Sequence, residues 1–125
     1  MAKTEIKEIK EGIKGLFATR TIYKDTLIFL LNGKKLSKPT RTSIQVKNKH
    51  VEHHKGGFMN HHCSPNAEVL LMKGEKMAFV MAKETIKKGE EITFDYETTE
   101  EELISPFKCE CHGKLIVGWN IFQRI

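Results

Sequence analysis

Two short stretches of the chain gather most of the residue types that do chemistry. The first runs from Gly57 to Asn66 and contains Asn60, His61 and Cys63. The second, Gly89–Tyr96, begins with a Gly-led turn and ends in Phe-Asp-Tyr. Amide, imidazole and phenol groups bind and orient substrates or cofactors, and a thiolate ligates metals. We therefore interpret these stretches as one candidate functional site.

The histidines allow a second interpretation, because five of the six lie in one segment. Imidazole and thiolate both suit zinc, so a metal centre could use His50, His53, His54, His61, His62 and Cys63. The spacing disfavours this centre. Adjacent residues such as His61 and His62 point apart on a strand, and Gly56-Gly57 and Pro65 prevent one helix face from holding the set. Exposed polar histidines are the alternative.

Short strands must position these residues, since apolar alternation is common and helical periodicity is rare. Strands are expected at 4–9, at 13–18 after a glycine turn, and at 26–31, 43–46, 67–72, 76–82 and 92–96. A continuous apolar run makes 26–31 a buried strand, and Asn32-Gly33 would suit a hairpin after it. The polar segment Lys34–Thr42 carries Pro39, so we expect a loop there.

The clearest hairpin joins 67–72 to 76–82 around Lys73-Gly74-Glu75. Its apolar face would consist of Val69, Leu71, Met77, Phe79 and Met81. One short helix is expected at Thr98–Leu103, where threonines precede acidic residues as in an N-cap and first turn, and Ser105-Pro106 would end it.

Composition places the chain among globular proteins of one domain, with 125 residues, 39% hydrophobic and 30% charged. The net charge of +5 is spread along the chain, so no nucleic-acid binding is expected. No apolar run approaches a membrane span, and residues 1–11 lack the apolar core of a signal peptide. A cytoplasmic location is expected, with nuclear or exported locations still open. Three cysteines are an odd number, which favours reduced thiols or a metal site.

The two stretches resemble, in order and spacing, the signature motifs of the SET domain, the fold of most protein-lysine methyltransferases. The segment Gly12–Ala18 is similar to the family's N-terminal Gly-x-Gly-x-Phe-Ala motif, with Ile13 at the first glycine position. The tail Phe107–Cys111 is similar to the post-SET segment. The resemblance implies a mainly β fold of several small curled sheets, little helix and a pseudoknot-like C-terminal segment. It divides the chain into a SET domain, 1–104, and a post-SET-like tail, 105–125, packed on it.

The resemblance also implies methyl transfer from S-adenosylmethionine to a lysine of a protein substrate, such as a histone or another nuclear or ribosomal protein. It assigns cofactor binding to Lys14, Gly15, Phe17, Asn60, His61 and Tyr96. Tyr96 would be the catalytic residue. Phe94 would line the lysine channel, where an apolar ring favours di- or trimethylation.

A zinc ion joins three tail cysteines to the Asn-His-x-Cys cysteine in SET relatives, so the resemblance implies a metal site at Cys63, Cys109 and Cys111. The third tail cysteine is replaced by Ile116, which leaves the fourth ligand open. His112 is chemically suitable, although it is adjacent to Cys111. Buried thiols without metal are the alternative.

Other differences from the SET family pattern concern the site that would bind the acceptor lysine. The chain has two tyrosines, Tyr23 and Tyr96, so the second channel tyrosine of many relatives has no counterpart. Gly57 replaces a common arginine, and the insert before the Asn-His motif is short. The acceptor groove would then be minimal or completed by a second subunit, as in a homodimer. The alternative function is a non-catalytic SET-like module that binds a protein partner, with or without zinc.

Overall fold

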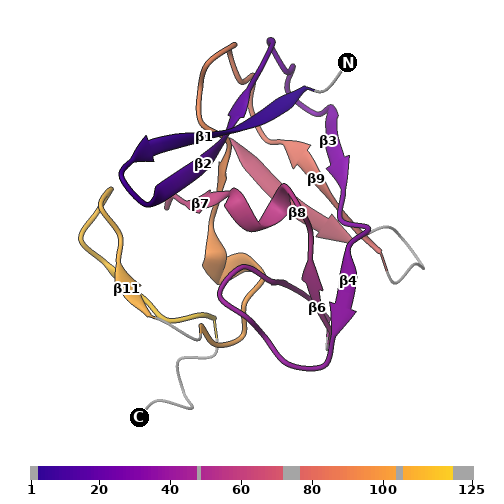
Figure 1. Cartoon of the computed structure of the whole chain (residues 1–125), viewed down its shortest axis with the longest axis vertical. Coiled ribbons are helices and arrows are strands. Elements are labelled where there is room, and N and C mark those ends of the chain that lie inside the picture. Colours follow the sequence, from indigo (N-terminus) through magenta and orange to yellow (C-terminus); the bar gives the residue numbers. More distant parts are fainter. Residues whose placement is uncertain (1–2, 48, 72–76, 104–105, 120–125) are drawn as a thin grey trace.

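The computed structural model describes residues 3–47, 49–71, 77–103 and 106–119, in which short strands dominate (Figure 1). The strands are Thr4–Lys10 (β1), Ile13–Ala18 (β2), Leu27–Leu30 (β3), Lys34–Leu36 (β4), Ile44–Val46 (β5), Lys49–Glu52 (β6), Asn60–His61 (β7), Ala67–Leu71 (β8), Ala78–Ala82 (β9), Thr93–Phe94 (β10), Phe107–Lys108 (β11) and Leu115–Ile116 (β12). Two 3-10 helices accompany them, Gly56–Phe58 (η1) and Tyr96–Thr98 (η2). None of the helices in these ranges has the length and apolarity to cross a bilayer.

The N-terminal strands β1 and β2 form an antiparallel hairpin in which Thr4 lies opposite Ala18. Gly12 closes the turn with a φ of +78°, in the left-handed region that glycine adopts without strain. The β2 side chains of Leu16 and Ala18 are buried in the core. Both predicted strands and the glycine turn between them are confirmed.

The central sheet has the order β3-β9-β8, and all of its pairs are antiparallel. The predicted strands of the β8–β9 hairpin are confirmed, whereas its expected turn lies outside the described residues. The predicted apolar face is wrong. The buried positions of β9 are Ala78, Val80 and Ala82, while Leu71 is 45% exposed. Alternate strand residues face opposite sides, so the small residues pack inward and the bulkier Met and Phe side chains take the other face.

The second three-stranded sheet has the order β4-β6-β5. Our expectation of a loop over Lys34–Thr42 is wrong at its start, because β4 pairs with β6 despite its two lysines. The strand at 26–31 is also less buried than predicted, since Leu27 is 42% exposed. Its expected hairpin is absent from the described pairs, where β3 pairs with β9. Gly33 joins the two sheets where a Cβ would come within 1.8 Å of the Glu52 carbonyl oxygen, which only glycine avoids.

The segment after β10 differs from the expected helix at Thr98–Leu103. Asp95 caps η2 by accepting the Glu97 N–H, so the helical turn starts earlier and ends at Thr98. Beyond it, the Leu103 N–H donates to the Val117 carbonyl, and the Glu100 carbonyl accepts from the Trp119 N–H. The Glu100 N–H still bonds the Tyr96 carbonyl in the helical i to i−4 pattern, but the bonds to the tail take the place of that pattern at Leu103 N–H and at the Glu100 carbonyl. The expected strand at 92–96 is correspondingly short, only Thr93–Phe94.

One hydrophobic core connects the small sheets, and it reaches both candidate stretches through Met59, Ile92 and Phe94. The largest fully buried side chains are Leu16, Leu31, Met59, Ile86, Ile92, Ile116 and Val80. In Figure 1 the tail strand β11 lies at the edge of the molecule away from β4. The predicted mainly β fold of several small sheets with little helix is confirmed.

Candidate active site

The two candidate stretches meet because β7 and β10 pair in parallel. Thr93 lies opposite Asn60 and Phe94 opposite His61, although the strands are far apart in sequence. The chain then turns at Asp95 into η2, which places Tyr96 beside the same pair of strands. This pairing assembles the predicted Asn-His and Phe-Asp-Tyr motifs at one place.

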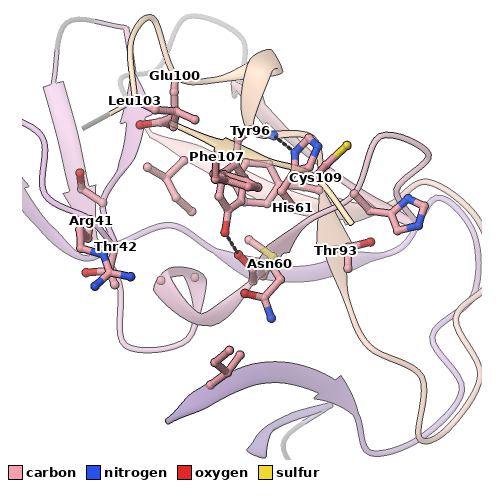
Figure 2. Close-up of a pocket in the computed structure, with 18 of the residues that line it drawn as sticks. Arg41, Thr42, Asn60, His61, Thr93, Tyr96, Glu100, Leu103, Phe107 and Cys109 are labelled. Carbon is pink, nitrogen blue, oxygen red and sulfur yellow. Dashed lines mark hydrogen bonds between the residues drawn. The ribbon is translucent and has the colours of Figure 1, made fainter. Parts of the chain in front are cut away.

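Tyr96 is fixed at both its backbone and its hydroxyl (Figure 2). The hydroxyl donates to the Met59 carbonyl at 2.7 Å. The ring packs on Phe94, with centroids 5.0 Å apart, and edge-on to Phe107 at 5.9 Å. Burial, with smaller contributions from Glu100 and Glu91, raises the pKa of Tyr96 well above its usual value. The phenol is therefore neutral at physiological pH.

His61 connects Tyr96 to the cysteines. Its side chain is 1% exposed, and its Nδ1 accepts the Tyr96 N–H at 3.1 Å. Because Nδ1 is an acceptor here, the proton of the neutral ring lies on Nε2, which is 3.3 Å from Cys63 Sγ. Burial lowers the pKa of His61, with the Asp95 carboxylate opposing it. The imidazole is therefore neutral and faces away from solvent.

Asn60 links the second stretch to the N-terminal hairpin. Its side-chain Nδ2 donates to the Lys14 carbonyl at 3.1 Å and to Glu91 Oε2 at 2.7 Å. Gly15 lies against this pair, since a Cβ there would be 2.6 Å from Glu91 Oε2 and 3.2 Å from Asn60 Nδ2. The predicted cofactor residues Lys14, Gly15 and Asn60 are thus neighbours.

A cavity of about 630 Å³ lies beside Asn60 and Tyr96 (Figure 2). Asn60, His61, Phe94 and Tyr96 line it, whereas Lys14, Gly15 and Phe17 do not. Phe17 instead lies under the ammonium of Lys7, 4.8 Å from the ring centroid. The cavity is also lined by residues outside the motifs, including Ile9, Arg41 and Leu103.

Two important groups carried no usable signal in the sequence. The Met59 carbonyl that holds Tyr96 belongs to the backbone, which any residue type supplies. Glu91 was visible only as one of several acidic residues in a β-rich segment. Its proximity to Asn60 comes from pairing between distant segments, which residue types alone do not reveal.

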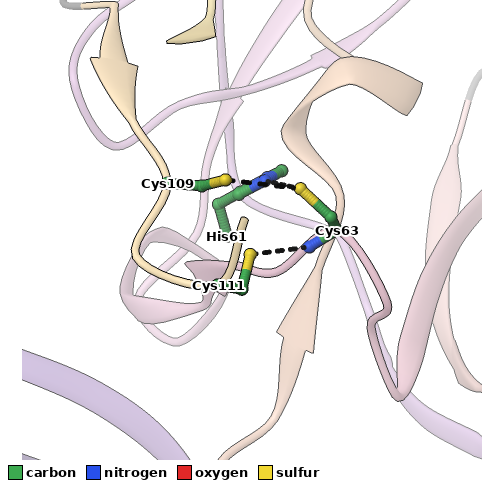
Figure 3. A group of neighbouring side chains, drawn as sticks. All are labelled: His61, Cys63, Cys109 and Cys111. Carbon is green, nitrogen blue, oxygen red and sulfur yellow. Dashed lines mark hydrogen bonds between the residues drawn. The ribbon is translucent and has the colours of Figure 1, made fainter. Parts of the chain in front are cut away.

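A second cluster lies next to the cavity and contains His61, Cys63, Cys109 and Cys111 (Figure 3). Their ligand atoms all lie within 4.8 Å of one another, and the Sγ atoms of Cys63 and Cys109 are 3.6 Å apart. We call this group the thiol cluster. It brings together the three predicted cysteines, and His61 rather than His112 occupies the fourth position.

The pKa values of the two closest thiols, Cys63 and Cys109, are shifted in opposite directions. Burial and hydrogen bonds with the other thiols raise the pKa of Cys63 to about 12. Burial also acts to raise the pKa of Cys109, but the N–H groups of Lys114 and His112 stabilise its thiolate and bring that pKa to about 7. Of these two thiols, Cys63 is therefore the S–H donor, and Cys109 carries negative charge more readily.

The alternative metal centre made of the histidines is not assembled in the described part of the chain. Of its six proposed ligands, His61 and Cys63 belong to the thiol cluster. His53 is instead structural. Its Nδ1 accepts from the Lys55 and Gly56 N–H groups, and its ring stacks between Phe29 and His54.

A family model described as the SET domain matches residues 14–97, which is more than half of the chain. The chain therefore belongs to the SET-domain family. The matched region contains all but the first residue of the hairpin strand β2, the parallel β7–β10 pair and Tyr96.

Curated relatives carry histone methyltransferase names. The chain is 42% identical over 64 residues to histone-lysine N-methyltransferase set-2 of Caenorhabditis elegans, covering 50% of this chain and 4% of that protein. It is 40% identical over 68 residues to the H3 lysine-4-specific histone-lysine N-methyltransferase of Mycosarcoma maydis, covering 48% and 5%. The chain thus spans a small fraction of the relatives' length.

Among solved structures, a putative histone methyltransferase of Plasmodium falciparum matches with a TM-score of 0.57. The sequence identity is 23%, and the match covers 77% of this chain and 94% of that chain. This likeness establishes the fold of the chain.

Proposed function

We propose that the chain transfers a methyl group from S-adenosylmethionine to the ε-amine of a protein lysine. The observation that supports this most directly is the Tyr96 hydroxyl, which is anchored to the Met59 carbonyl on the wall of the cavity. The family and the names of the relatives agree with this chemistry.

The cavity suits the cofactor in size and in the groups that it offers. Its volume of about 630 Å³ falls in the usual range for small-molecule sites, roughly 300–1,000 Å³. Asn60, Glu91 and Thr93 provide polar atoms, and Ile9, Ile13 and Met59 provide apolar surface. When bound, S-adenosylmethionine supplies a methyl group on a positively charged sulfur.

The chain's own residues prepare the lysine. A free lysine has a pKa near 10.4, so about one amine in 10³ is neutral at pH 7. The rings of Phe94, Tyr96 and Phe107 form an apolar surface, which lowers the pKa of an inserted amine by desolvation. The Tyr96 hydroxyl proton is committed to the Met59 carbonyl, so its oxygen can accept an amine N–H. The amine is thereby held with its lone pair free.

We also propose that the thiol cluster binds zinc, because three thiols and an imidazole form a common zinc ligand set. Ligation through His61 Nε2 requires the ring proton on Nδ1. That nitrogen lies 3.6 Å from Asp95 Oδ1, which could accept the proton in place of the present bond from the Tyr96 N–H. The donor set fits a metal after this exchange of partners.

The decisive experiment measures transfer of a labelled methyl group to histone H3 and to a mixed pool of cellular proteins. We expect transfer by the wild type and a fall of about a hundredfold in kcat for Tyr96→Phe, as is typical when one positioned hydrogen-bonding group is lost. Tyr23→Phe is the matched control, because Tyr23 is 67% exposed and should transfer at the wild-type rate.

Two results would contradict the proposal. Equal rates for Tyr96→Phe and the wild type would remove Tyr96 from the chemistry. A wild type that binds no S-adenosylmethionine in calorimetry and labels no protein would favour the non-catalytic binding module instead.

A further inference from the structure

Three oxygen-bearing groups of different origin converge beside the cavity, two of them as acceptors from the Asn60 amide. The Lys14 carbonyl comes from β2, the Asn60 amide from β7 and the Glu91 carboxylate from the segment before β10. Asn60 Nδ2 lies 3.1 Å from the Lys14 oxygen and 2.7 Å from Glu91 Oε2. We call this group the acceptor corner.

The acceptor corner has a defined orientation. Both partners of Asn60 Nδ2 are acceptors, so only the NH₂ side of the amide can face them. The Asn60 carbonyl oxygen is therefore turned away from both partners and is available to accept. Gly15 keeps this arrangement compact, because a Cβ there would press on Glu91 Oε2 and Asn60 Nδ2.

The charge of the acceptor corner is negative. Glu91 and Asn60 both line the cavity and present oxygen atoms. The cation Lys10 also lines the cavity, but its Nζ lies 3.9 Å from the Glu110 carboxylate of the tail. A carboxylate next to a fixed amide oxygen is a suitable site for a positively charged hydrogen-bond donor.

We propose that Glu91 binds the ammonium group of the amino acid part of the cofactor, an inference that rests on the proposed function. An ammonium has three N–H donors and no acceptor, which matches a corner built of oxygens. The other cationic centre of S-adenosylmethionine, its sulfonium, has no hydrogen to donate. Glu91 would thus contact the cofactor directly and also orient Asn60.

The test compares Glu91→Gln with the wild type by calorimetry, using three ligands. The three ligands differ in their cationic groups. S-adenosylmethionine has both the ammonium and the sulfonium, S-adenosylhomocysteine has the ammonium alone, and methylthioadenosine has neither. The substituted amide keeps an oxygen for Asn60 but loses the charge. We expect about tenfold weaker binding of the first two ligands and unchanged binding of the third.

Glu90→Gln is the matched control, since it removes the same charge from the adjacent, exposed residue, whose carboxylate bonds the Lys87 N–H in the turn. It should bind all three ligands like the wild type. Unchanged methylthioadenosine binding also shows that Glu91→Gln has kept the cavity intact.

Each other outcome overturns the inference in a recognisable way. Equal affinities of wild type and Glu91→Gln for the first two ligands would exclude Glu91 while leaving the proposed function standing. Weaker binding of S-adenosylmethionine alone would mean that the Glu91 carboxylate interacts with the sulfonium and not with the ammonium. Equal weakening for all three would indicate a purely structural role. A wild type that binds none of the ligands would overturn the proposed function together with this inference.

Discussion

At the scale of single residues, the direction of one hydrogen bond determines how Tyr96 can act. The hydroxyl donates a hydrogen bond to the Met59 carbonyl, and burial raises the pKa of Tyr96 so that the proton stays on the phenol oxygen. The phenol is therefore suited to accept a hydrogen bond from the substrate amine and not to remove a proton as a base. The same bond keeps the ring against Phe94.

Phe94→Tyr should lower the number of methyl groups transferred. Phe94 is 3% exposed and touches the Tyr96 ring, so a new hydroxyl would enter the proposed lysine channel. A hydroxyl there can hold a water beside the amine, which takes up the room of a further methyl group. We expect mainly monomethylated product, against di- or trimethylated product for the wild type, measured by mass spectrometry of histone H3 or the labelled acceptor.

Phe29→Tyr serves as the control for this substitution, because Phe29 stacks on His53 and does not line the cavity. It should leave the product distribution unchanged. The buried hydroxyl of Phe94→Tyr should also cost about 1–3 kcal/mol of stability, so assays belong well below its melting temperature. An unaltered distribution in folded Phe94→Tyr would contradict the channel role.

At the scale of elements, the tail is attached to the site by packing and by the thiol cluster. Phe107 of β11 lies edge-on to both His61 and Tyr96. Cys109 and Cys111 follow it and reach Cys63, which lies two residues after β7. The tail is therefore in direct contact with the strand that carries Asn60 and His61.

The purified protein should contain about one zinc ion per chain, measured by mass spectrometry of metals without a histidine tag. Cys109→Ser and His61→Ala should lose it, because each removes one of four ligands. His112→Ala should keep it, since His112 lies outside the thiol cluster. Full zinc in His61→Ala, or its loss in His112→Ala, would show that the fourth ligand is assigned wrongly.

At the scale of the whole molecule, Glu100 connects three distant parts of the chain. Its buried carboxylate accepts from the Gln45 N–H of β5 and from the Thr99 hydroxyl, and its carbonyl accepts from the Trp119 N–H of the tail. Burial raises the pKa of this carboxyl above 4.5, against the effect of the two hydrogen bonds. The folded state therefore prefers the protonated form.

Stability should consequently depend on pH at Glu100. Because the folded pKa is raised, the folded state binds the proton more tightly than the unfolded state. This contribution is fully present below the unfolded value near 4.5 and is lost as pH rises through the folded pKa. Glu100→Gln can accept the same two hydrogen bonds but does not titrate.

The measurement is the melting temperature of the wild type minus that of Glu100→Gln across pH 4 to 8. We expect this difference to fall as the pH rises above about 4.5 and to level off once Glu100 is ionised. The subtraction removes the effect of all other titrating groups. A flat difference would mean that burial does not raise the pKa of Glu100.

The sequence predicted the elements that depend on neighbouring residues. The β1–β2 and β8–β9 strands follow from alternation and glycine turns, and these are local signals. The inward face of β9 was missed, because packing selected Ala78 and Val80 over bulkier side chains. The expected helix failed because tail residues far along the chain take its backbone bonds.

In the candidate site, too, the sequence motifs predicted some features, while contacts between distant segments determined others. The resemblance selected Asn60, His61 and Tyr96 correctly as neighbours, since motif order reflects a shared fold. The place of His61 in the thiol cluster was not predicted, because it depends on which way one ring turns. The position of Glu91 was missed for a similar reason, because it depends on contacts between three segments.

The parallel pairing of β7 with β10 also has a consequence for synthesis of the chain. A ribosome completes β7 before it makes β10, which begins 33 positions later, from 60 to 93. At about 5–20 residues per second this delay lasts roughly 2–7 seconds. β7 therefore emerges from the ribosome that long before β10, and in this interval the edge of β7 that β10 will cover is open to any other strand. The nascent protein thus carries a transient opportunity for mispairing at the very segment on which its chemistry depends.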